Sequence, residues 1–516
     1  MPTAPRALVL GTAALLAGGA MPTSLPRAAQ GAPRRSAAED PPAIAPAEYA
    51  ARRAALAARL DDSAVAVVAL GAGEPPNDYE PFAQAPSFRW LTGFVEPDAA
   101  LVMVRRGAAV RATLFVQPSD PAREVWTGVR AGLAGARAAT GLDTRPAREL
   151  RPVLDSLAGA GLPLAIVGEL EVRGVPTREG VLVAGLRAAH PGLRATSVAA
   201  AVLPLRARKS TAEMARIRRA ADVTVRALGE AMRLVAPGVR EYEVQALLEY
   251  TFRRLGGDGP SFVSIVGSGP NGTVLHHAAG ARVMRAGEVV VMDVGASWDG
   301  YAADVTRTLP VSGRFTPAQR ALYQVVRDAQ AAAERAAVPG ARWAAVSDSA
   351  AGTLARGLAR LGLVESPAAT YDCAEPRSPG GAPPQCPQLG LFYYHGLGHG
   401  IGLEVHDPAQ FYAGDGTIRP GDAFTIEPGL YVRARVLDLL PRTPRNLALA
   451  ARLADAVRRL ADVGVRIEDD YVATERGVEW ISRAPREVGE VEAAMAGARR
   501  GVAAPDTAAR GGRRPR

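Results

Sequence analysis

The stretch Glu288–Val311, EVVVMDVGASWDGYAADVTRTLPV, carries the pattern that decides the fold of the C-terminal half of the chain. Two apolar runs flank a short polar segment that contains Asp299-Gly300, a dipeptide favoured in two-residue hairpin turns. The sequence therefore predicts two antiparallel strands, Val289–Val294 and Tyr301–Thr308.

One acidic residue lies on each predicted strand, Asp293 on the first and Asp304 on the second. A turn centred on Trp298-Asp299 would place the two directly opposite each other, whereas a turn centred on Asp299-Gly300 makes them diagonal neighbours on one face. Either register brings two like charges together on an apolar hairpin, where burial requires a cation between them. The alternative is a solvent-facing polar stripe, which the apolar run before Asp293 disfavours.

A glycine-rich stretch, FYYHGLGHGIGLEVHD (Phe392–Asp407), holds three histidines. His395 and His399 are four residues apart, but the glycines around them argue against a helix, and no HExxH zinc motif is present. We expect a strand and loop that present His395, His399 and His406 instead. Five of the six histidines fall between His276 and His406, a concentration that core packing explains poorly.

Two further apolar segments add carboxylates. Glu427 lies in AFTIEPGLYV, an apparent apolar strand in which a buried carboxylate needs a partner. In GVRIEDDYVAT, a period of two puts Arg466 and Glu468 on one face, and Asp470 shares that face as either a supporting or an exposed group. The order Asp, Asp, His, Glu, Glu, at intervals of 11, 95, 28 and 41 residues, is more specific than any single fragment.

Several stretches together resemble the pita-bread metallopeptidases, particularly the Xaa-Pro aminopeptidases. The resemblance covers residues 46–490 and implies an α+β fold: a C-terminal pita-bread (creatinase/aminopeptidase) catalytic domain preceded by a smaller α/β creatinase-type N-terminal domain. The stretches are SIVGSGPNGTVLHH, MDVGASWDGYAADVTRT, HGLGHGIGLEVHD, IEPGLYV and VRIEDDYV, with APSFRWLTGFVEPDAALVMV and REVWTGVRAG resembling the family's N-terminal domain.

The resemblance implies roles for individual residues. Five would bind two divalent metal ions: Asp293, Asp304, His399, Glu427 and Glu468. Four carboxylates and one imidazole favour manganese, although zinc or cobalt also fits such a site. A metal-bridged hydroxide would be the nucleophile, with Glu427 also shuttling a proton. The remaining implied catalytic residues contact the substrate or stand beside a ligand: His276, His395, His406 and Arg466.

The implied function is hydrolysis of the peptide bond between an N-terminal residue and a following proline. The partners would be peptides with proline at the second position, and the chain would form a homo-oligomer, a dimer or tetramer. One alternative is an Xaa-Pro dipeptidase. Another is a non-catalytic peptide-binding relative, which is disfavoured because such relatives lose the acidic ligands.

Length and composition set the domain plan. The 516 residues exceed what one core usually organises. Arg6 followed by the apolar Ala7–Ala20 suits the hydrophobic region of a signal peptide and is short for a membrane span; an uncleaved anchor is the alternative. We expect export to the periplasm or medium, with cleavage after Ala20 or nearer Gly31 and no stable membrane insertion afterwards. The predicted parts are a signal peptide (1–31), a linker (32–45), the N-terminal domain (46–202), the catalytic domain (203–492) and a disordered basic tail (493–516).

The net charge of +9 is spread along the chain and comes almost entirely from arginine, with Lys209 the only lysine. This pattern fits a GC-rich codon bias better than phosphate binding, so no nucleic-acid partner is expected. Cys373 and Cys386 flank a Pro/Gly-rich loop and are either a disulfide or two free thiols.

Three features depart from the family pattern. The segments 372–389 and 433–464 are longer than in compact bacterial members, and we expect them to reshape the mouth of the site. Arg89 and Trp90 stand where an aromatic pair often occurs in members that share active sites between subunits, which leaves such sharing open here.

Overall fold

The computed structural model describes residues 40–62, 64–77, 81–374, 382–408 and 416–499. The predicted signal peptide, most of the linker and the last part of the predicted tail lie outside these residues. The described residues from Pro41 onward belong to one compact unit. Within them, no helix combines the length and the apolar character that crossing a membrane requires.

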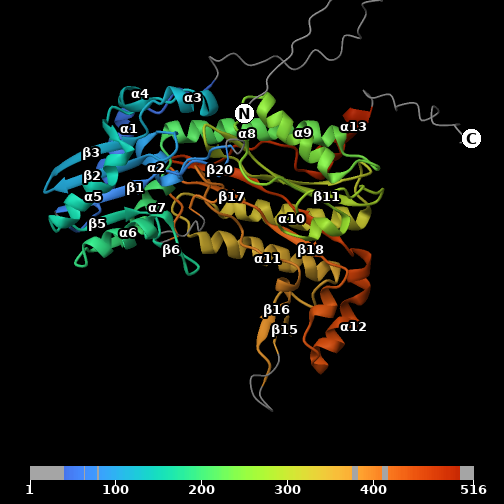
Figure 1. The fold of residues 1–516 in the computed structure, drawn as a ribbon. Helices are drawn as coiled ribbons and strands as arrows, with labels where there is room; N and C mark the ends of the chain where they lie inside the picture. Colours follow the sequence, from blue (N-terminus) through green and yellow to red (C-terminus); the bar gives the residue numbers. More distant parts are fainter. Residues whose placement is uncertain (1–39, 63, 78–80, 375–381, 409–415, 500–516) are drawn as a thin grey trace, which may run out of the picture. The chain divides into compact units, whose positions relative to one another are not determined.

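The N-terminal domain is built on a six-stranded sheet with the strand order β4-β3-β2-β1-β5-β8 (Figure 1). Its central strand β1 is an unbroken run of apolar residues whose alternate side chains enter two separate cores, one on each face of the sheet. Helices cover both faces, as such a run requires. The elements are α1 (Pro46–Ala58), β1 (Ala64–Leu70), α2 (Pro86–Thr92), β2 (Ala100–Arg106), β3 (Ala109–Val116), α3 (Pro121–Thr127), α4 (Gly132–Thr140), β4 (Asp143–Pro146), α5 (Leu150–Gly159), β5 (Leu164–Val167), α6 (Arg178–Ala189), β8 (Ala195–Ser197) and α7 (Ala199–Ala207), with a small hairpin β6–β7 (Glu171–Val172, Val175–Pro176).

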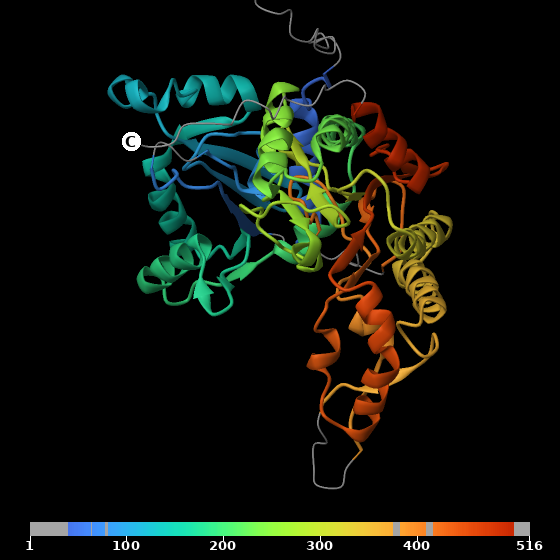
Figure 2. The same ribbon diagram turned by 90° about the vertical axis from the view of Figure 1, so that its right-hand side faces the viewer.

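The second domain combines short sheets with long helices. Its first helix, α8, starts at a capping box: Ser210 Oγ accepts from the Glu213 amide, and the Glu213 carboxylate accepts from the Ser210 amide. Helices α10 and α11 pack side by side along the sheets (Figures 1 and 2). The elements are α8 (Thr211–Leu234), α9 (Glu241–Arg254), β9 (Gly259–Pro260), β10 (Ile265–Ser268), β11 (Val289–Val294), β12 (Ala296–Trp298), β13 (Tyr301–Ala302), β14 (Val305–Pro310), α10 (Pro317–Ala336), α11 (Trp343–Leu361), β17 (Ala423–Ile426), β18 (Gly429–Val432), α12 (Pro444–Arg459), β19 (Val463–Arg466), β20 (Asp469–Thr474), β21 (Gly477–Trp480) and α13 (Val488–Arg499).

The hairpin register is the second of the two that the sequence allowed. Trp298 pairs with Tyr301, so the turn is centred on Asp299-Gly300, whose φ values of 45° and 72° suit a type I′ turn. Asp293 therefore faces Thr306, which makes Asp304 its diagonal neighbour.

Three predicted elements differ from the structure. The strand Tyr301–Thr308 is interrupted at Ala303 and Asp304. The apolar segments around Glu427 and Glu468 are likewise not continuous strands, because each breaks at the glutamate and continues into a different sheet. These breaks let the acidic side chains leave the pleat and turn toward one place. At the C-terminus, α13 extends to Arg499 and so includes residues 493–499 of the predicted tail.

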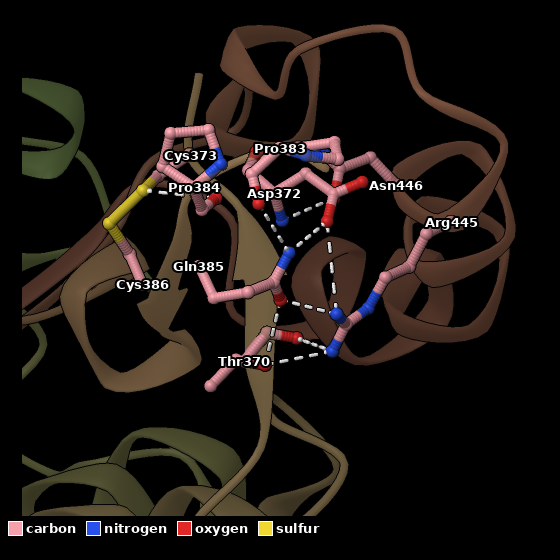
Figure 3. Close-up of a disulfide and its surroundings, with 9 residues drawn as sticks. All are labelled: Thr370, Asp372, Cys373, Pro383, Pro384, Gln385, Cys386, Arg445 and Asn446. Atoms are coloured by element: carbon pink, nitrogen blue, oxygen red, sulfur yellow. Dashed lines mark hydrogen bonds and ion pairs between the residues drawn. A yellow bond between two sulfur atoms is a disulfide. The ribbon is translucent and has the colours of Figure 1, made fainter. Parts of the chain in front are cut away.

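The two cysteines form a disulfide between Cys373, directly after β15 (Thr370–Asp372), and Cys386, within β16 (Gln385–Pro387) (Figure 3). This hairpin packs on α12. Arg445 donates to the Thr370 carbonyl at 2.8 Å, and Asn446 exchanges hydrogen bonds with the backbone of Asp372 at 2.9 and 3.1 Å. The two longer segments of the sequence thus pack against each other.

Arg89 lies at the junction of the two domains rather than on a free surface. Its guanidinium donates to the Asp299 carboxylate at 2.6 Å and to the Asp299 carbonyl at 2.8 Å, which ties α2 to the hairpin turn. Trp90 is buried within the N-terminal core. Both residues at the position of the family's aromatic pair therefore have partners within this chain.

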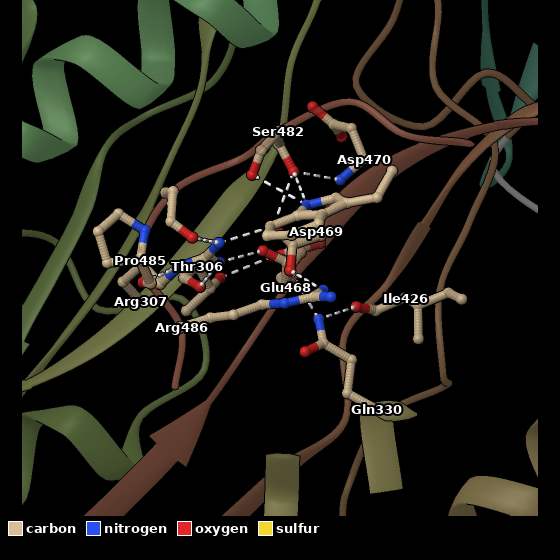
Figure 4. A network of polar contacts seen from close by, with 12 residues as sticks. Thr306, Arg307, Gln330, Ile426, Glu468, Asp469, Asp470, Ser482, Pro485 and Arg486 are labelled. Carbon is tan, nitrogen blue, oxygen red and sulfur yellow. Dashed lines mark hydrogen bonds and ion pairs between the residues drawn. The ribbon is translucent and has the colours of Figure 1, made fainter. Parts of the chain in front are cut away.

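A buried ion pair joins β14 to β20 (Figure 4). Arg307 and Asp469 are fully buried and lie 2.7 Å apart. Arg307 also donates to four backbone carbonyls, those of Thr306, Glu468, Ala484 and Pro485. Asp469 accepts further hydrogen bonds from Gln330, Ser482 and Arg486. Nearly every polar atom of the pair is satisfied, as a buried charge requires.

We predict that Arg307→Met lowers the free energy of unfolding by about 3–5 kcal/mol, because it leaves the Asp469 charge buried without its main partner. Urea unfolding of the metal-stripped protein measures this change. Arg320→Met is the matched control: Arg320 pairs with Glu492 at 2.7 Å but is half exposed, so its loss should cost no more than about 1 kcal/mol. Equal losses for both variants would contradict the prediction.

Candidate metal centre and active site

One cavity of about 300 Å³ brings together every site residue that the sequence predicted. Strands β11 and β19 and the breaks next to β14, β17 and β20 supply its acidic and basic side chains, and two loops supply the histidines. None of the described residues of 372–389 and 433–464 lines this cavity, and the reshaping of the mouth by these segments stays a prediction. The lining residues are Leu275, His276, Asp293, Asp304, His395, Gly396, Gly398, His399, His406, Glu427, Arg466 and Glu468.

Both aspartates line the cavity, and each has one buried carboxylate oxygen without a hydrogen-bond partner in the described part of the chain. Both side chains are buried, and the Oδ1 atoms of Asp293 and Asp304 are unpaired among the described residues. The backbone amide of Asp304 donates to the Asp470 carboxylate at 3.2 Å, which identifies Asp470 as a buried supporting group. Buried carboxylate oxygens without a donor are costly unless a cation binds them.

His399 presents one ring nitrogen to the carboxylates. Its Nδ1 bonds the Gly400 carbonyl at 3.1 Å, which leaves Nε2 as the free lone pair. That nitrogen lies 3.5 Å from Asp304, 3.5 Å from Glu427 and 4.0 Å from Glu468. Asp304, His399 and Glu468 each offer a ligand atom within 4.8 Å of the others. This geometry suits a cation between them.

Hydrogen bonds to Thr306 and Leu397 fix the positions of Glu468 and Glu427. Glu468 accepts from the Thr306 hydroxyl at 2.6 Å, and its amide donates to the Thr306 carbonyl at 3.1 Å. The amide of Glu427 donates to the Leu397 carbonyl at 2.8 Å, which aligns it with the histidine loop. In each case one carboxylate oxygen remains directed at the cavity and at His399.

Tyr431 is a site residue that sequence reasoning missed. Arg466 donates to Asp293 and, at 2.8 Å, to the Tyr431 hydroxyl, which lies 2.8 Å from His395 Nε2. His395 Nδ1 in turn bonds the Gly396 carbonyl at 2.8 Å. Because the Gly396 carbonyl can only accept, Nδ1 of the neutral His395 ring carries the hydrogen, and Nε2 accepts from the tyrosine hydroxyl. The signal was the IEPGLYV motif itself, in which Tyr431 alternates with Gly429 on the strand facing Arg466.

The other two histidines border the cavity at its open side. His276 and His406 are exposed, and the His406 ring lies 3.9 Å from that of His399 between centroids. Both also line an adjoining cavity of about 280 Å³ whose walls include Phe262, Val263 and Ile265. The arrangement is a polar floor of carboxylates beneath a rim of imidazoles.

The electrostatics of the floor fit a cation. Burial, followed by the neighbouring carboxylates, raises the pKa of Asp304 and Glu468 well above the ordinary range, and burial raises the pKa of Glu427 to about 8. Burial also lowers the pKa of His399 to about 4, so its imidazole is neutral. Four convergent carboxylates, two of them with an unpaired oxygen, and one neutral imidazole are a hard, oxygen-rich donor set for divalent metal.

These features are those of a metal-dependent hydrolase. Residues 215–475 match the model of metallopeptidase family M24, and residues 49–162 match the aminopeptidase P N-terminal domain. The chain therefore belongs to metallopeptidase family M24, and it is a metallo-aminopeptidase in which divalent metal ions are the family's cofactors. The expected α+β architecture with two domains of these types is confirmed.

Relatives match over nearly their whole length. An Escherichia coli Xaa-Pro aminopeptidase is 31% identical and aligns over 88% of this chain and 98% of its own; a Streptomyces coelicolor Xaa-Pro aminopeptidase 2 is 34% identical over 88% and 92%. A human Xaa-Pro dipeptidase is 29% identical over 84% and 89%. Among solved structures, Escherichia coli aminopeptidase P in complex with substrate has a TM-score of 0.73 at 28% identity, covering 89% of this chain and 99% of its own.

Asp304→Asn tests the metal centre. We expect it to weaken Mn²⁺ binding by roughly 100-fold or more, since even supporting groups around metal ligands contribute 10–100-fold. The metal-stripped variant should be at least as stable as the parent, because a charge that repels its neighbours is gone. Calorimetric titration with Mn²⁺ and urea unfolding measure the two effects.

The matched control is Asp328→Asn, which removes an exposed carboxylate from α10 that binds only Gln324 among the contacts described for it. It should leave Mn²⁺ affinity unchanged. Unaltered affinity in Asp304→Asn would rule out a role for Asp304 in the metal site.

Proposed function

We propose that this enzyme is an Xaa-Pro aminopeptidase, which hydrolyses the bond between an N-terminal residue and a following proline. The observation that carries the proposal is the convergence of Asp293, Asp304, His399, Glu427 and Glu468 on one cavity. The relatives named Xaa-Pro aminopeptidase, and the fold shared with aminopeptidase P in complex with substrate, give the substrate class.

In this proposal those five residues hold two divalent metal ions, with manganese favoured over zinc or cobalt by the four carboxylates. Bound at such a site, the pair of metals would activate water and polarise the scissile carbonyl. The unpaired oxygens of the two aspartates support this assignment, because a buried carboxylate oxygen without a hydrogen-bond donor is stabilised by a bound cation.

The protein's own groups then manage protons and orientation. The carboxyl group of Glu427 takes a proton from the attacking water and gives it to the proline nitrogen as the carbon–nitrogen bond breaks. Like any amide nitrogen, the scissile proline nitrogen leaves as an amine only when it gains a proton, and this transfer supplies it. The pKa of Glu427 is about 8 in the absence of a cation, because the buried site favours the protonated form of its carboxyl group.

The histidines orient the substrate in this scheme. His395 is neutral, because burial and the adjacent Arg466 charge lower its pKa to about 4, and its ring is fixed between Tyr431 and Gly396. His276 and His406, on the exposed rim, are placed to contact the bound peptide beside the scissile bond. Arg466 holds Asp293 and Tyr431 in position rather than acting on the peptide.

We further propose that the protein is exported and works as a homo-oligomer, a dimer or tetramer. Export is supported by the apolar segment Ala7–Ala20 and by the disulfide between Cys373 and Cys386, since such bonds persist in oxidising compartments. The oligomer rests on the family resemblance.

The substrate class can be tested with the metal-stripped full chain, assayed with and without Mn²⁺ on an Xaa-Pro dipeptide and on an Xaa-Pro-Xaa peptide of the same first residue. We expect Mn²⁺-dependent release of the first residue from the longer peptide. The matched Xaa-Ala-Xaa peptide should be cleaved at least about 100-fold more slowly, because the imino ring would no longer fill its place.

The other outcomes separate the alternatives. Cleavage of the dipeptide alone would make the protein an Xaa-Pro dipeptidase like the human relative. Equal rates on the proline and alanine peptides would contradict proline specificity, and loss of cleavage in Glu427→Gln with Mn²⁺ still bound would agree with its role in proton transfer.

A further inference from the structure

His406 sits on a short segment that we call the His406 loop, residues 402–407. The loop adjoins His399 in two ways. The ring of His406 packs against the ring of His399, and the loop begins two residues after Gly400, whose carbonyl bonds His399 Nδ1. The loop has no helix or strand of its own to fix it. Something outside it must therefore hold His406 over the cavity.

Lys209 touches the loop from behind. Its side chain is buried, and its amine donates to the carbonyl of Asp407 at 2.9 Å and to that of Arg206 at 2.7 Å. Gly402, at the other end of the loop, lies so close that a Cβ there would stand 2.7 Å from Lys209 Cε and 2.5 Å from Asp407 Oδ2. The amine thus occupies a closed space between both ends of the loop.

Arg206 makes a second set of bonds to the same loop. It is buried, and its Nη2 lies 2.6 Å from the Glu404 carboxylate and 3.0 Å from that of Asp407. Its Nη1 donates to Ser87 Oγ at 3.0 Å on α2 of the N-terminal domain. Asp407 also accepts from the Leu403 amide at 2.9 Å, which closes the loop on itself.

The N-terminal domain and the metal-site hairpin complete the grip. Leu403 packs against the apolar core that contains Phe88 and Leu91. The carbonyl of Gly402 accepts from the Ala302 amide at 2.7 Å, immediately before the break that carries Asp304. The loop is therefore clamped between the two domains, and His406 is the residue of the loop that lines the cavity.

We propose that Lys209 and Arg206 are positioning residues that set His406 in the active site by clamping the His406 loop onto the domain junction. The proposal rests on the proposed function, in which His406 contacts the substrate. It makes the end of the N-terminal domain a working part of the active site.

The identity of Lys209 supports this assignment. Every other basic position among the 61 lysine and arginine residues of the chain is an arginine. A compact ammonium group can bond two carbonyls in the space left beside Gly402, whereas a planar guanidinium has a larger and fixed fork of donors. The one lysine therefore stands at a position where geometry requires the smaller head group.

The first test measures the loop directly. Hydrogen exchange of the metal-stripped full chain, followed by mass spectrometry, should be at least about tenfold faster in peptides covering 402–407 for Lys209→Met than for the parent. The matched control is Arg208→Met, which removes the neighbouring cation of the same linker; Arg208 is half exposed and bonds Pro420 and Asp422 rather than the loop. No change in Lys209→Met, or an equal change in both variants, would overturn the clamp. This measurement needs no catalytic activity, so it stands even if the proposed function fails.

The second test asks whether Lys209 acts through His406. With Mn²⁺ and the Xaa-Pro-Xaa peptide, Lys209→Met should lower kcat/KM about 10–100-fold, the size of effect that a misplaced catalytic contact produces. In the double variant with His406→Ala, the loss should match that of His406→Ala alone, because the second change removes the group that the first displaces. If the kcat/KM losses of the two single variants multiply in the double variant, Lys209 has a general structural effect and the proposal is overturned.

Lys209→Arg keeps the charge and guards against failure of the methionine variant to fold. It should retain Mn²⁺ binding and yet lose kcat/KM in the same non-multiplying way with His406→Ala. Full activity in Lys209→Arg would overturn the argument from head-group size. If the parent itself cleaves no Xaa-Pro peptide, the proposed function fails, and hydrogen exchange alone decides the clamp.

Discussion

Four carboxylates directed at one cavity are the constraint around which the rest of this domain is arranged. Each would repel the others, and burial raises the pKa of Asp304 and Glu468 further. The protein opposes that cost with few groups of its own: Arg466 pairs with Asp293, and the Thr306 hydroxyl donates to Glu468. The uncompensated negative charge suits a divalent cation, which is why this cavity is the candidate metal centre.

A second charge cluster behind the first keeps the carboxylates in place. Arg307 and Asp469 are the chain neighbours of Thr306 and Glu468, and their ion pair joins β14 to β20 close to the breaks that carry Asp304 and Glu468. Arg307 also bonds the carbonyls of Thr306 and Glu468 themselves. The Arg307–Asp469 pair, which is hydrogen-bonded on nearly all its polar atoms, holds the strands together against the repulsion among the four cavity carboxylates. It does not neutralise the charge of those carboxylates.

The N-terminal domain contributes to this arrangement without lining the cavity floor. Arg89 holds the turn of the hairpin that carries both aspartates, and Arg206 with Lys209 holds the loop that carries His406. Two separate parts of the active site are thus anchored at one domain junction. Arg89 stands where the family pattern often has an aromatic residue, and its ion pair with Asp299 ties the hairpin to the N-terminal domain of the same chain.

The sequence by itself determined the local structure and the membership of the site. Period-two patterns and the Asp299-Gly300 turn specified the hairpin, and the family resemblance carried by the sequence motifs named all five candidate metal ligands. Only the tertiary structure decided the hairpin register, the breaks at Asp304, Glu427 and Glu468, and the partners Tyr431 and Lys209. The reason is physical: local patterns encode which face a side chain takes, whereas the pairing of Thr306 with Glu468, 162 residues apart, depends on packing that no local pattern contains.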